Sequence, residues 1–190
     1  MATEYELKYG ATAAALAAID AAYKEAPTRY QMETTYYDTP SHALSQRHIT
    51  LRRRMENETS VCTLKAPAKL GRAEFELECD NIEEAIPELC KLSGVDPTLL
   101  SEGVTPVCGA RFTRLAHTIT LPDATVELAL DSGVLLGGGK ELPLCEVEVE
   151  LKEGSPSAAA FFAAQLALAY GLQPENKSKF ARAIALAKGE

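Results

Sequence analysis

Apolar and charged residues alternate at the start of the chain, which predicts a strand over residues 4–8. Side chains on a strand point to opposite faces in turn, so Glu4, Glu6 and Lys8 share one face. The tyrosines and the leucine beside them take the other face. Two carboxylates next to an ammonium group can hold a divalent cation and the anion that it binds.

The same alternation returns in four later runs. One such run is typical of a strand with its apolar face on the core and its charged face in water. Like charges at consecutive positions of one face repel each other, so repeated acidic runs predict positive side chains opposite them. The charged faces are formed by Arg52 and Arg54, by Thr63 and Lys65, by Arg72, Glu74, Glu76 and Glu78, and by Glu146, Glu148 and Glu150.

The remaining pattern predicts a single α+β domain over residues 1–190, with about eight antiparallel strands and helices packed outside. Further strands are expected at residues 31–37, 49–55, 60–66, 72–79, 108–121, 125–132 and 144–151. Helices are expected at residues 13–26, 82–92, 155–170 and 179–188, with Pro87 interrupting the second and a short helical turn at residues 97–100. Gly137-Gly138-Gly139 predicts a flexible hairpin turn.

Two architectures fit charged faces on nearly every strand. One is an open sheet with its charged face in water, and the other is a closed barrel with a polar, wet interior. The strand count and the complementary acidic and basic runs favour a closed eight-stranded antiparallel β-barrel. Acidic and basic groups would then face one another inside it.

Charge and cysteine content narrow the possible partners. The 190 residues carry a formal net charge of −8, which disfavours general binding to a nucleic-acid backbone. Arg and Lys gather in tight clusters, however, which suits a small polyanion. The five cysteines form no Cys-x-x-Cys pair, and no secretory signal or long apolar run precedes them. We therefore expect reduced thiols in a cytoplasmic protein without a membrane partner.

The order of several short motifs resembles that of the CYTH family, the triphosphate tunnel metalloenzymes, over nearly the whole chain. The hallmark of that family is an N-terminal Glu-x-Glu-x-Lys, which Glu4, Glu6 and Lys8 match. The motifs that follow are Tyr36-Tyr37-Asp38-Thr39-Pro40, Leu51-Arg52-Arg53-Arg54, Thr63-Leu64-Lys65, Arg72-x-Glu74-x-Glu76, Phe112-Thr113-Arg114, Glu127 to Asp131, Cys145-Glu146-Val147-Glu148 and Ser178-Lys179-x-x-Arg182. Their order makes the resemblance specific, and the last one, with Phe-Thr-Arg, is most similar to the bacterial inorganic triphosphatases.

The resemblance implies an eight-stranded antiparallel tunnel in which basic residues grip a linear triphosphate and acidic residues hold Mg²⁺ or Mn²⁺. The implied triphosphate contacts are Lys8, Arg52, Arg54, Lys65, Arg114, Lys179 and Arg182. The implied metal ligands or water positioners are Glu4, Glu6, Asp131, Glu146 and Glu148, with Glu74, Glu76 and Glu127 as supporting carboxylates. Glu4, Lys8, Arg54 and Lys65 are the implied catalytic residues.

One position departs from the family. Many members carry Lys two residues before the arginine that Arg114 matches, and this chain has Phe112 there. Arg111 is one residue away, but strand alternation points it to the opposite face. The sequence therefore leaves the register of this strand open.

The leading hypothesis is metal-dependent hydrolysis of inorganic triphosphate to pyrophosphate and phosphate. Alternatives within the family are nucleoside triphosphate hydrolysis, cyclisation as in class IV adenylate cyclases, and thiamine triphosphate hydrolysis, with Tyr36 and Tyr37 as candidate contacts of the thiazolium ring. A polyphosphate-binding module is the non-enzymatic alternative, although clustered glutamates beside the basic residues favour an enzyme. The expected partner is a small triphosphate.

The helices at residues 155–170 and 179–188 either plug one end of the barrel or form a homodimer surface.

Overall fold

The computed structural model describes residues 5–68 and 72–189, so Glu4 of the N-terminal motif lies outside the described residues. The strands are β1 (Glu6–Gly10), β2 (Thr28–Asp38), β3 (Thr50–Glu56), β4 (Thr59–Pro67), β5 (Arg72–Glu78), β6 (Thr105–Thr120), β7 (Ala124–Gly137), β8 (Lys140–Gly154) and β9 (Gln173–Pro174). The helices are α1 (Ala13–Ala22), α2 (Ile82–Ser93), α3 (Pro156–Tyr170) and α4 (Lys179–Lys188), with short 3₁₀ turns at Ser45–Arg47 and Pro97–Leu100.

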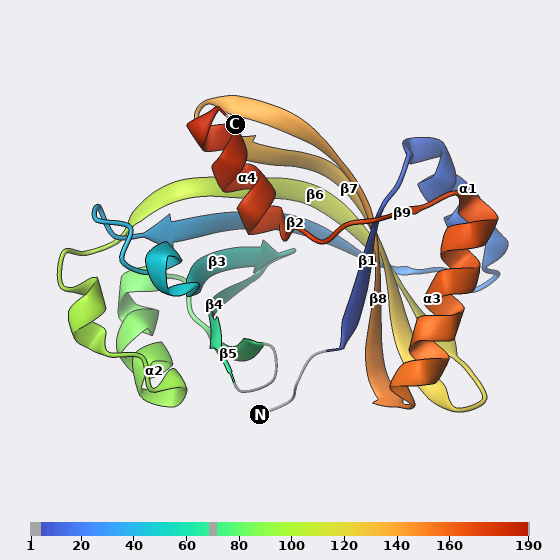
Figure 1. Cartoon of the computed structure of the whole chain (residues 1–190), viewed down its shortest axis with the longest axis horizontal. Coiled ribbons are helices and arrows are strands. Elements are labelled where there is room, and N and C mark those ends of the chain that lie inside the picture. The colour runs from blue at the N-terminus through green and yellow to red at the C-terminus, as the bar shows by residue number, and fades with distance from the viewer. Residues whose placement is uncertain (1–4, 69–71, 190) are drawn as a thin grey trace.

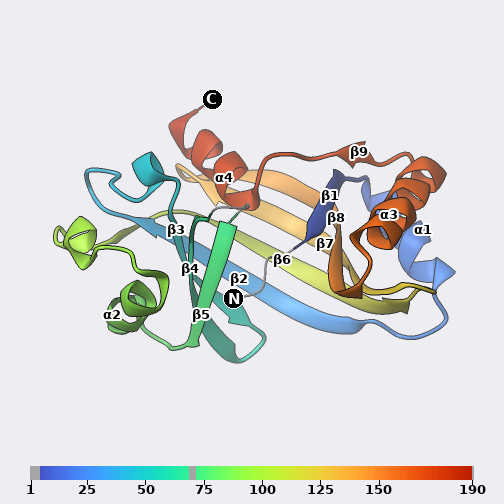
Figure 2. The same ribbon diagram turned by 60° about the horizontal axis from the view of Figure 1, so that its bottom comes forward.

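Within the described residues, nine strands form one sheet in the order β5-β4-β3-β2-β6-β7-β8-β1-β9. All neighbouring strands are antiparallel. Figures 1 and 2 show that the long strands curve, so that the sheet wraps around a concave inner face. The mixed architecture with a large antiparallel sheet is as predicted.

The sheet is not closed, which corrects the predicted closed eight-stranded barrel. β5 and β9 are its two ends. The segment around β9 covers part of the outer edge of β1: Tyr9 pairs with Pro174, and the Glu175 amide donates to the Lys8 carbonyl at 2.9 Å. Backbone groups of β1 that are bonded in this way cannot also pair with β5.

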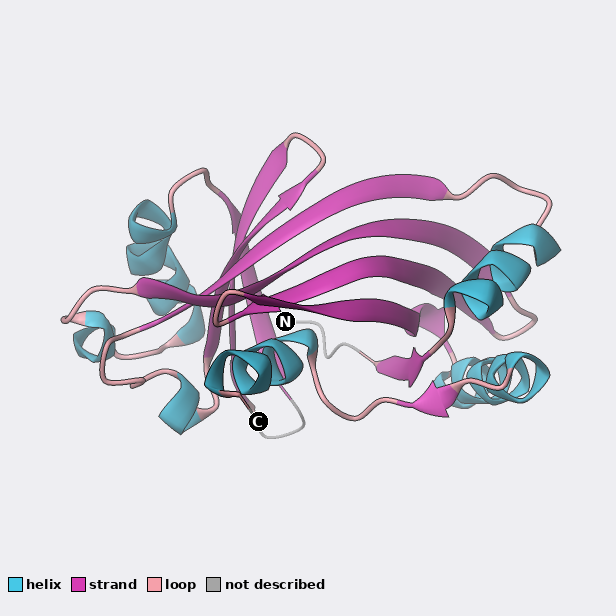
Figure 3. Cartoon of the chain, turned by 90° about the horizontal axis from the view of Figure 1, so that it is seen from above, coloured by secondary structure: helices cyan, strands magenta, loops and turns pink. Residues whose placement is uncertain are grey.

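Helices cover the outer face of the sheet at two ends, which Figure 3 shows clearly. At one end, Leu128 and Val147 are fully buried in a core that α1 and α3 complete. At the other end, Leu51 and Leu64 are fully buried in a core that includes residues of α2. Each such side chain contributes roughly 1.5–3 kcal/mol through burial. The alternation of the strands leaves their charged residues on the inner face.

The last helix, α4, packs on the inner face instead. Ala183 joins Phe112, Leu135 and Leu144 in a small buried core at the end where β7 and β8 meet. Figure 1 shows α4 crossing β6 and β7 there. A Cβ on Gly137 would lie 2.3 Å from the Ala183 carbonyl oxygen. The glycine tract therefore provides the expected hairpin turn and also the space that α4 needs.

Some boundaries differ from the prediction. α1 ends at Ala22 rather than near residue 26, because Tyr23 has an extended backbone and its ring packs on His117 with centroids 5.0 Å apart. Pro87 lies within α2 without interrupting it. Burial of Ile82 and Leu89 on both sides of the proline offsets the lost backbone hydrogen bond.

Candidate active site

A pocket of about 130 Å³ opens on the inner face of the sheet, beside the first residues of α4. Among the described residues, its lining contains seven basic side chains and three acidic ones, although the whole chain has a formal net charge of −8. The basic residues are Lys8, Arg52, Arg54, Lys65, Arg72, Arg114 and Lys179, and the acidic ones are Glu6, Glu148 and Glu150. Positive charge is therefore concentrated on the inner face.

A wider hollow of about 810 Å³ continues along the same face. It shares Arg52, Arg54, Arg114 and Glu150 with the first pocket. Glu76 and Glu127, two of the predicted supporting carboxylates, line this wider hollow. The two hollows thus lie side by side on the inner face, and the first residues of α4 border the smaller one.

Glu74 holds two of the predicted triphosphate contacts in place. β4 and β5 pair so that Lys65 lies opposite Glu74. One Glu74 oxygen is 2.7 Å from Lys65 Nζ, and the other accepts a hydrogen bond from Arg52 at 3.1 Å. Glu76 is 3.7 Å from Arg52 and accepts a hydrogen bond from Thr63 at 3.1 Å. Glu74 and Glu76, two of the predicted supporting carboxylates, thus contact basic side chains of the inner face.

Arg52 and Arg54 have unused capacity to bind an anion. Arg52 Nε is buried, and no described residue accepts a hydrogen bond from it. Arg54 donates to Thr34 Oγ1 at 3.1 Å and lies 3.7 Å from Glu56. Burial, and then the like charge of Arg52, lowers the pKa of Arg54. Buried guanidinium groups that repel one another are stabilised by an anionic ligand such as phosphate.

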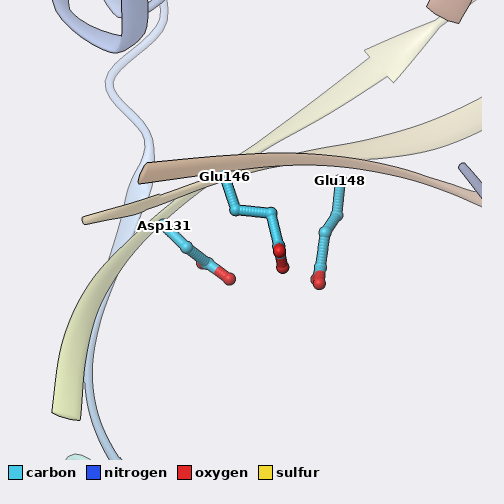
Figure 4. Close-up of side chains that lie close together, drawn as sticks. All are labelled: Asp131, Glu146 and Glu148. Carbon is cyan, nitrogen blue, oxygen red and sulfur yellow. The ribbon is translucent and has the colours of Figure 1, made fainter. Parts of the chain in front are cut away.

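Three carboxylates converge behind the pocket, and we call Asp131, Glu146 and Glu148 the acidic cluster. Figure 4 shows them pointing to the same side from neighbouring strands, Asp131 from β7 and the two glutamates from β8. One oxygen of each carboxylate lies within 4.8 Å of the others. The cluster results from strand register, because Asp131 pairs with Glu146 across β7 and β8 and Glu148 follows two residues later on the same face.

Cations of the protein itself neutralise the acidic cluster. Lys179, the first residue of α4, has its Nζ 2.9 Å from Asp131 and 2.6 Å from Glu148, and it also bonds Glu146. Arg114 binds Asp131 through two hydrogen bonds of 2.8 Å each and also bonds Glu148. This bidentate geometry is the strong form of an arginine–carboxylate pair.

The ionisation of the cluster follows from these contacts. Burial disfavours the charged form of Glu148, but Lys179 and Arg114 hold its pKa well below its usual range. Burial likewise disfavours the ammonium form of Lys179, but the three carboxylates, Glu148 foremost, raise its pKa above the usual range. Both groups are therefore ionised at neutral pH.

The carboxylates present fit a hard divalent cation, because Mg²⁺ and Mn²⁺ prefer oxygen ligands. Lys179 already bonds every member of the acidic cluster, so an ion that used all three would have to displace its ammonium group. Glu6 and Glu150 line the open pocket together with Glu148. Glu148 thus belongs to both candidate ligand sets.

Most predicted site residues come together, but Arg182 is placed differently. Among the described residues, the pocket lining does not include it. Arg182 bonds Glu146 and lies 3.7 Å from Glu175, because helical spacing puts it almost one turn beyond Lys179. Its contact with triphosphate stays a prediction.

The structure settles the register of β6. Arg114 pairs with Asp131, whereas the exposed side chain of Arg111 donates to Glu141 at 3.0 Å. Phe112 shares the inner face with Arg114 and is buried. Lys179 Nζ lies 5.3 Å from the centre of the Phe112 ring, within range of a cation–π contact. An aromatic ring thus occupies the position where many family members carry lysine.

Several pocket residues were missing from the predicted site. Arg72 lines the pocket and donates to the carbonyl oxygens of His48 and Lys65 and to Thr50 Oγ1. Strand alternation places Arg72 on the same face as Glu74, so the sequence alone could have identified Arg72 as a residue of the inner face. Phe180, which lines the pocket beside Tyr36 with ring centroids 5.2 Å apart, had no such signal because it comes from α4.

The chain belongs to the CYTH family, whose domain model matches residues 2–184. An inorganic triphosphatase of Haemophilus influenzae is 33% identical over 128 residues, which cover 64% of this chain and 36% of that protein. The chain therefore spans little more than a third of the length of this curated relative.

Solved structures share the fold at low sequence identity. A protein from Hippeastrum, described as a putative adenylyl cyclase with a dominant triphosphatase activity, has a TM-score of 0.72 at 19% identity, covering 99% of this chain and 97% of that chain. A putative adenylate cyclase from Bacillus halodurans has a TM-score of 0.60 at 12% identity, covering 92% of this chain and 93% of that chain. None of the helices formed by the described residues is long and apolar enough to cross a membrane.

Proposed function

We propose that this protein hydrolyses inorganic triphosphate to pyrophosphate and phosphate on the inner face of its sheet, with Mg²⁺ or Mn²⁺ bound there. The observation that carries the proposal is the lining of the pocket, to which the described part of the chain contributes seven basic side chains and three carboxylates. A linear triphosphate is a compact polyanion that this lining complements. The inorganic triphosphatase of Haemophilus influenzae, at 33% identity, supports the choice of substrate.

Basic residues of the pocket bind the phosphate groups in this proposal. Arg52 and Arg54 offer planar guanidinium groups, which match two phosphate oxygens at once. Lys8 and Lys65 act as point charges that neutralise the leaving group. Binding also satisfies the buried Nε of Arg52 and relieves the repulsion between neighbouring guanidinium groups.

Carboxylates would hold the metal ion in this proposal. Glu6 and Glu148 are the predicted ligands that line the pocket. Glu4, from the same N-terminal motif as Glu6, would be a third ligand. When bound, a divalent ion lowers the pKa of a water molecule and neutralises developing negative charge. Glu4 and Glu6 orient the attacking water, while Lys8, Arg54 and Lys65 stabilise the charge on the departing pyrophosphate.

A second candidate is hydrolysis of an organic triphosphate. Tyr36 and Phe180 line the same pocket with ring centroids 5.2 Å apart. Aromatic rings next to a triphosphate site suit a base or a thiazolium ring. ATP and thiamine triphosphate therefore belong in the same assay as inorganic triphosphate.

We also propose that residues 1–190 form one domain and that the protein works in the cytoplasm. All five cysteines are free. Burial raises the pKa of the Cys62 thiol to about 11 and that of Cys108 to about 12. Thiols with such values remain protonated at neutral pH and are poor nucleophiles, as expected for structural cysteines in a reducing compartment.

Phosphate release from inorganic triphosphate, ATP and thiamine triphosphate, measured side by side with Mg²⁺, with Mn²⁺ and with a chelator, tests the proposal. We expect the fastest release from inorganic triphosphate, loss of release with the chelator, and a large loss in Glu6→Gln. Glu141→Gln is the matched control, because Glu141 is exposed and bonds Arg111 on the outside.

Two results would contradict the proposal in different ways. Tight binding of inorganic triphosphate without any phosphate release would identify a binding module rather than an enzyme. Faster turnover of ATP or thiamine triphosphate would identify an organic triphosphatase and assign Tyr36 and Phe180 to the organic group.

A further inference from the structure

The outer layer formed by α1 and α3 carries almost no charge. Residues 154–174, which contain α3, include no Asp, Glu, Lys, Arg or His. α1 contains one charged residue, Asp20, and it is bound to His117 at 2.9 Å. Two neutral neighbouring helices are unusual on the surface of a chain with a formal net charge of −8.

Large apolar side chains are exposed on α3. Phe161 is 65% exposed and Leu168 is 88% exposed. They are seven residues apart, so they lie on one stripe of the helix with Ala164 and Gln165 between them. A contiguous exposed apolar surface marks a place where a protein binds a partner.

An apolar hollow lies beside each of these side chains. The hollow next to Phe161 has a volume of about 440 Å³ and is lined by Leu121, Pro122 and Phe162, among others. The hollow next to Leu168 has a volume of about 460 Å³, and Leu172 contributes to it. The stripe on α3 thus offers a projecting side chain and a hollow at each of its two ends.

We propose that α3 packs antiparallel against α3 of a second copy of this chain, around a two-fold axis near Gln165. Phe161 of each copy then meets Leu168 of the other copy, and each projecting side chain fills a hollow of its partner. Such an interface is isologous, because the same patch serves both copies. The occupant of the apolar face is therefore the protein itself.

The pattern of the stripe favours a second copy over an unrelated partner. Its polar member, Gln165, lies at the centre of the stripe. A two-fold axis there places Gln165 of one molecule next to Gln165 of the other. A carboxamide carries both donors and an acceptor, so two glutamines can pair with each other. Two molecules that each carry a net charge of −8 also repel least when they meet through neutral faces.

The size of the face sets the expected strength of the dimer. At about 1.5 Å per residue and about 10 Å of width, the 15 residues of α3 and the 10 residues of α1 give a footprint on the order of 370 Å². The exposed side chains that α1 contributes are alanines, which let a partner approach closely. A contact of this size lies below the range of standard specific interfaces, so we expect a weak dimer that forms only at high protein concentration.

The proposed dimer leaves the candidate active site open. α1 and α3 cover the outer face of the sheet, whereas the basic pocket lies on the inner face. The proposal therefore stands independently of the proposed hydrolysis. Figures 1 and 2 show α1 and α3 together at the opposite end of the molecule from α2.

Sedimentation of the whole chain between about 1 and 200 µM tests the proposal, since a weak dimer should form towards the upper end of this range. We expect the mass to rise from 20.4 kDa towards twice that value. Leu168→Glu should weaken the association at least tenfold, because it places a charge in the apolar contact. Leu92→Glu is the matched control, since Leu92 is an exposed leucine of α2, at 49% exposure.

A crosslinking experiment provides a second test that does not depend on a strong dimer. Gln165→Cys should form a covalent dimer with a short bifunctional thiol reagent, and Leu92→Cys should not, with the native cysteines common to both. A chain that stays monomeric throughout the range, or a Leu168→Glu variant that associates like the wild type, would overturn the proposal. Circular dichroism confirms that each variant is folded.

Discussion

Lys179 Nζ lies 2.6 Å from Glu148 Oε1, so the first residue of α4 is bound directly to the acidic cluster on the inner face. The lysine is 7% exposed, and its ammonium group, together with Arg182, joins α4 to β7 and β8 electrostatically. Removing one partner of a buried ion pair leaves the other charge uncompensated, which costs more than the pair itself contributes.

Lys179→Met should therefore lower the free energy of unfolding by about 3–5 kcal/mol. Chemical denaturation without metal ions measures this change. Lys188→Met is the matched control, because Lys188 is an exposed lysine of the same helix, and it should change stability by no more than about 0.5 kcal/mol. Equal stability of the two variants would contradict the structural role of Lys179.

Acid should also loosen this contact. The pKa of Glu148 is lowered in the folded protein, so its contribution is present above the unfolded value of about 4.3 and is lost as pH falls through the folded value. We expect stability to fall steadily below about pH 4. Lys179→Met should show a weaker fall, because Glu148 loses its strongest partner. The midpoint temperature of thermal unfolding, measured at several pH values from neutral to acidic, gives the stability curves of the wild type and of Lys179→Met.

Glu74→Gln should weaken substrate binding without abolishing catalysis. Glu74 holds Arg52 and Lys65 in place at 3.1 and 2.7 Å, and the substitution removes the charge that orients them. We expect KM for triphosphate to rise about tenfold, the effect of losing roughly 1.4 kcal/mol, while kcat changes less. Glu78→Gln, on the same strand face but exposed, is the control. A loss confined to kcat would assign Glu74 a direct catalytic role instead.

Gly137→Ala should displace α4. A Cβ at this position would meet the Ala183 carbonyl oxygen at 2.3 Å and the Ala187 amide nitrogen at 2.8 Å, which are backbone atoms that cannot move separately from the helix. We expect a loss of stability of about 1–3 kcal/mol, typical of overpacking. Gly10→Ala, whose Cβ would meet only a carbonyl oxygen at 3.8 Å, should fold normally. Thermal unfolding of the two variants distinguishes these outcomes.

The inner-face residues were predictable because strand alternation is a local property of the sequence. Glu6, Lys8, Arg52, Arg54 and Lys65 all line the pocket, as their shared faces imply. Whether the sheet closes into a barrel was not predictable in the same way. It depends on which backbone edges pair, and the pairing of β1 with the short β9 leaves no trace in the hydrophobic pattern.

The position of α4 was also beyond local reasoning. Its place on the inner face follows from the space left by Gly137 and Gly138 and from the reach of Lys179, which are contacts between distant segments. The glycine tract by itself indicated only a turn. For the same reason, the sequence could not show that Lys179 and Arg114 neutralise the acidic cluster.

If the basic inner face binds and cleaves triphosphate, as proposed, Arg52→Ala and Arg111→Ala should differ in activity. Arg52 lies in the pocket with a buried Nε that has no acceptor among the described residues, whereas Arg111 is on the outside, 60% exposed, and bonds Glu141. Phosphate release from inorganic triphosphate is measured for both variants, together with calorimetric binding. We expect a loss of kcat/KM of about 10–100-fold in Arg52→Ala, the effect of a charged hydrogen bond worth about 1.5–3 kcal/mol, and wild-type values in Arg111→Ala. Wild-type turnover in Arg52→Ala would show that the basic inner face is not the site of hydrolysis.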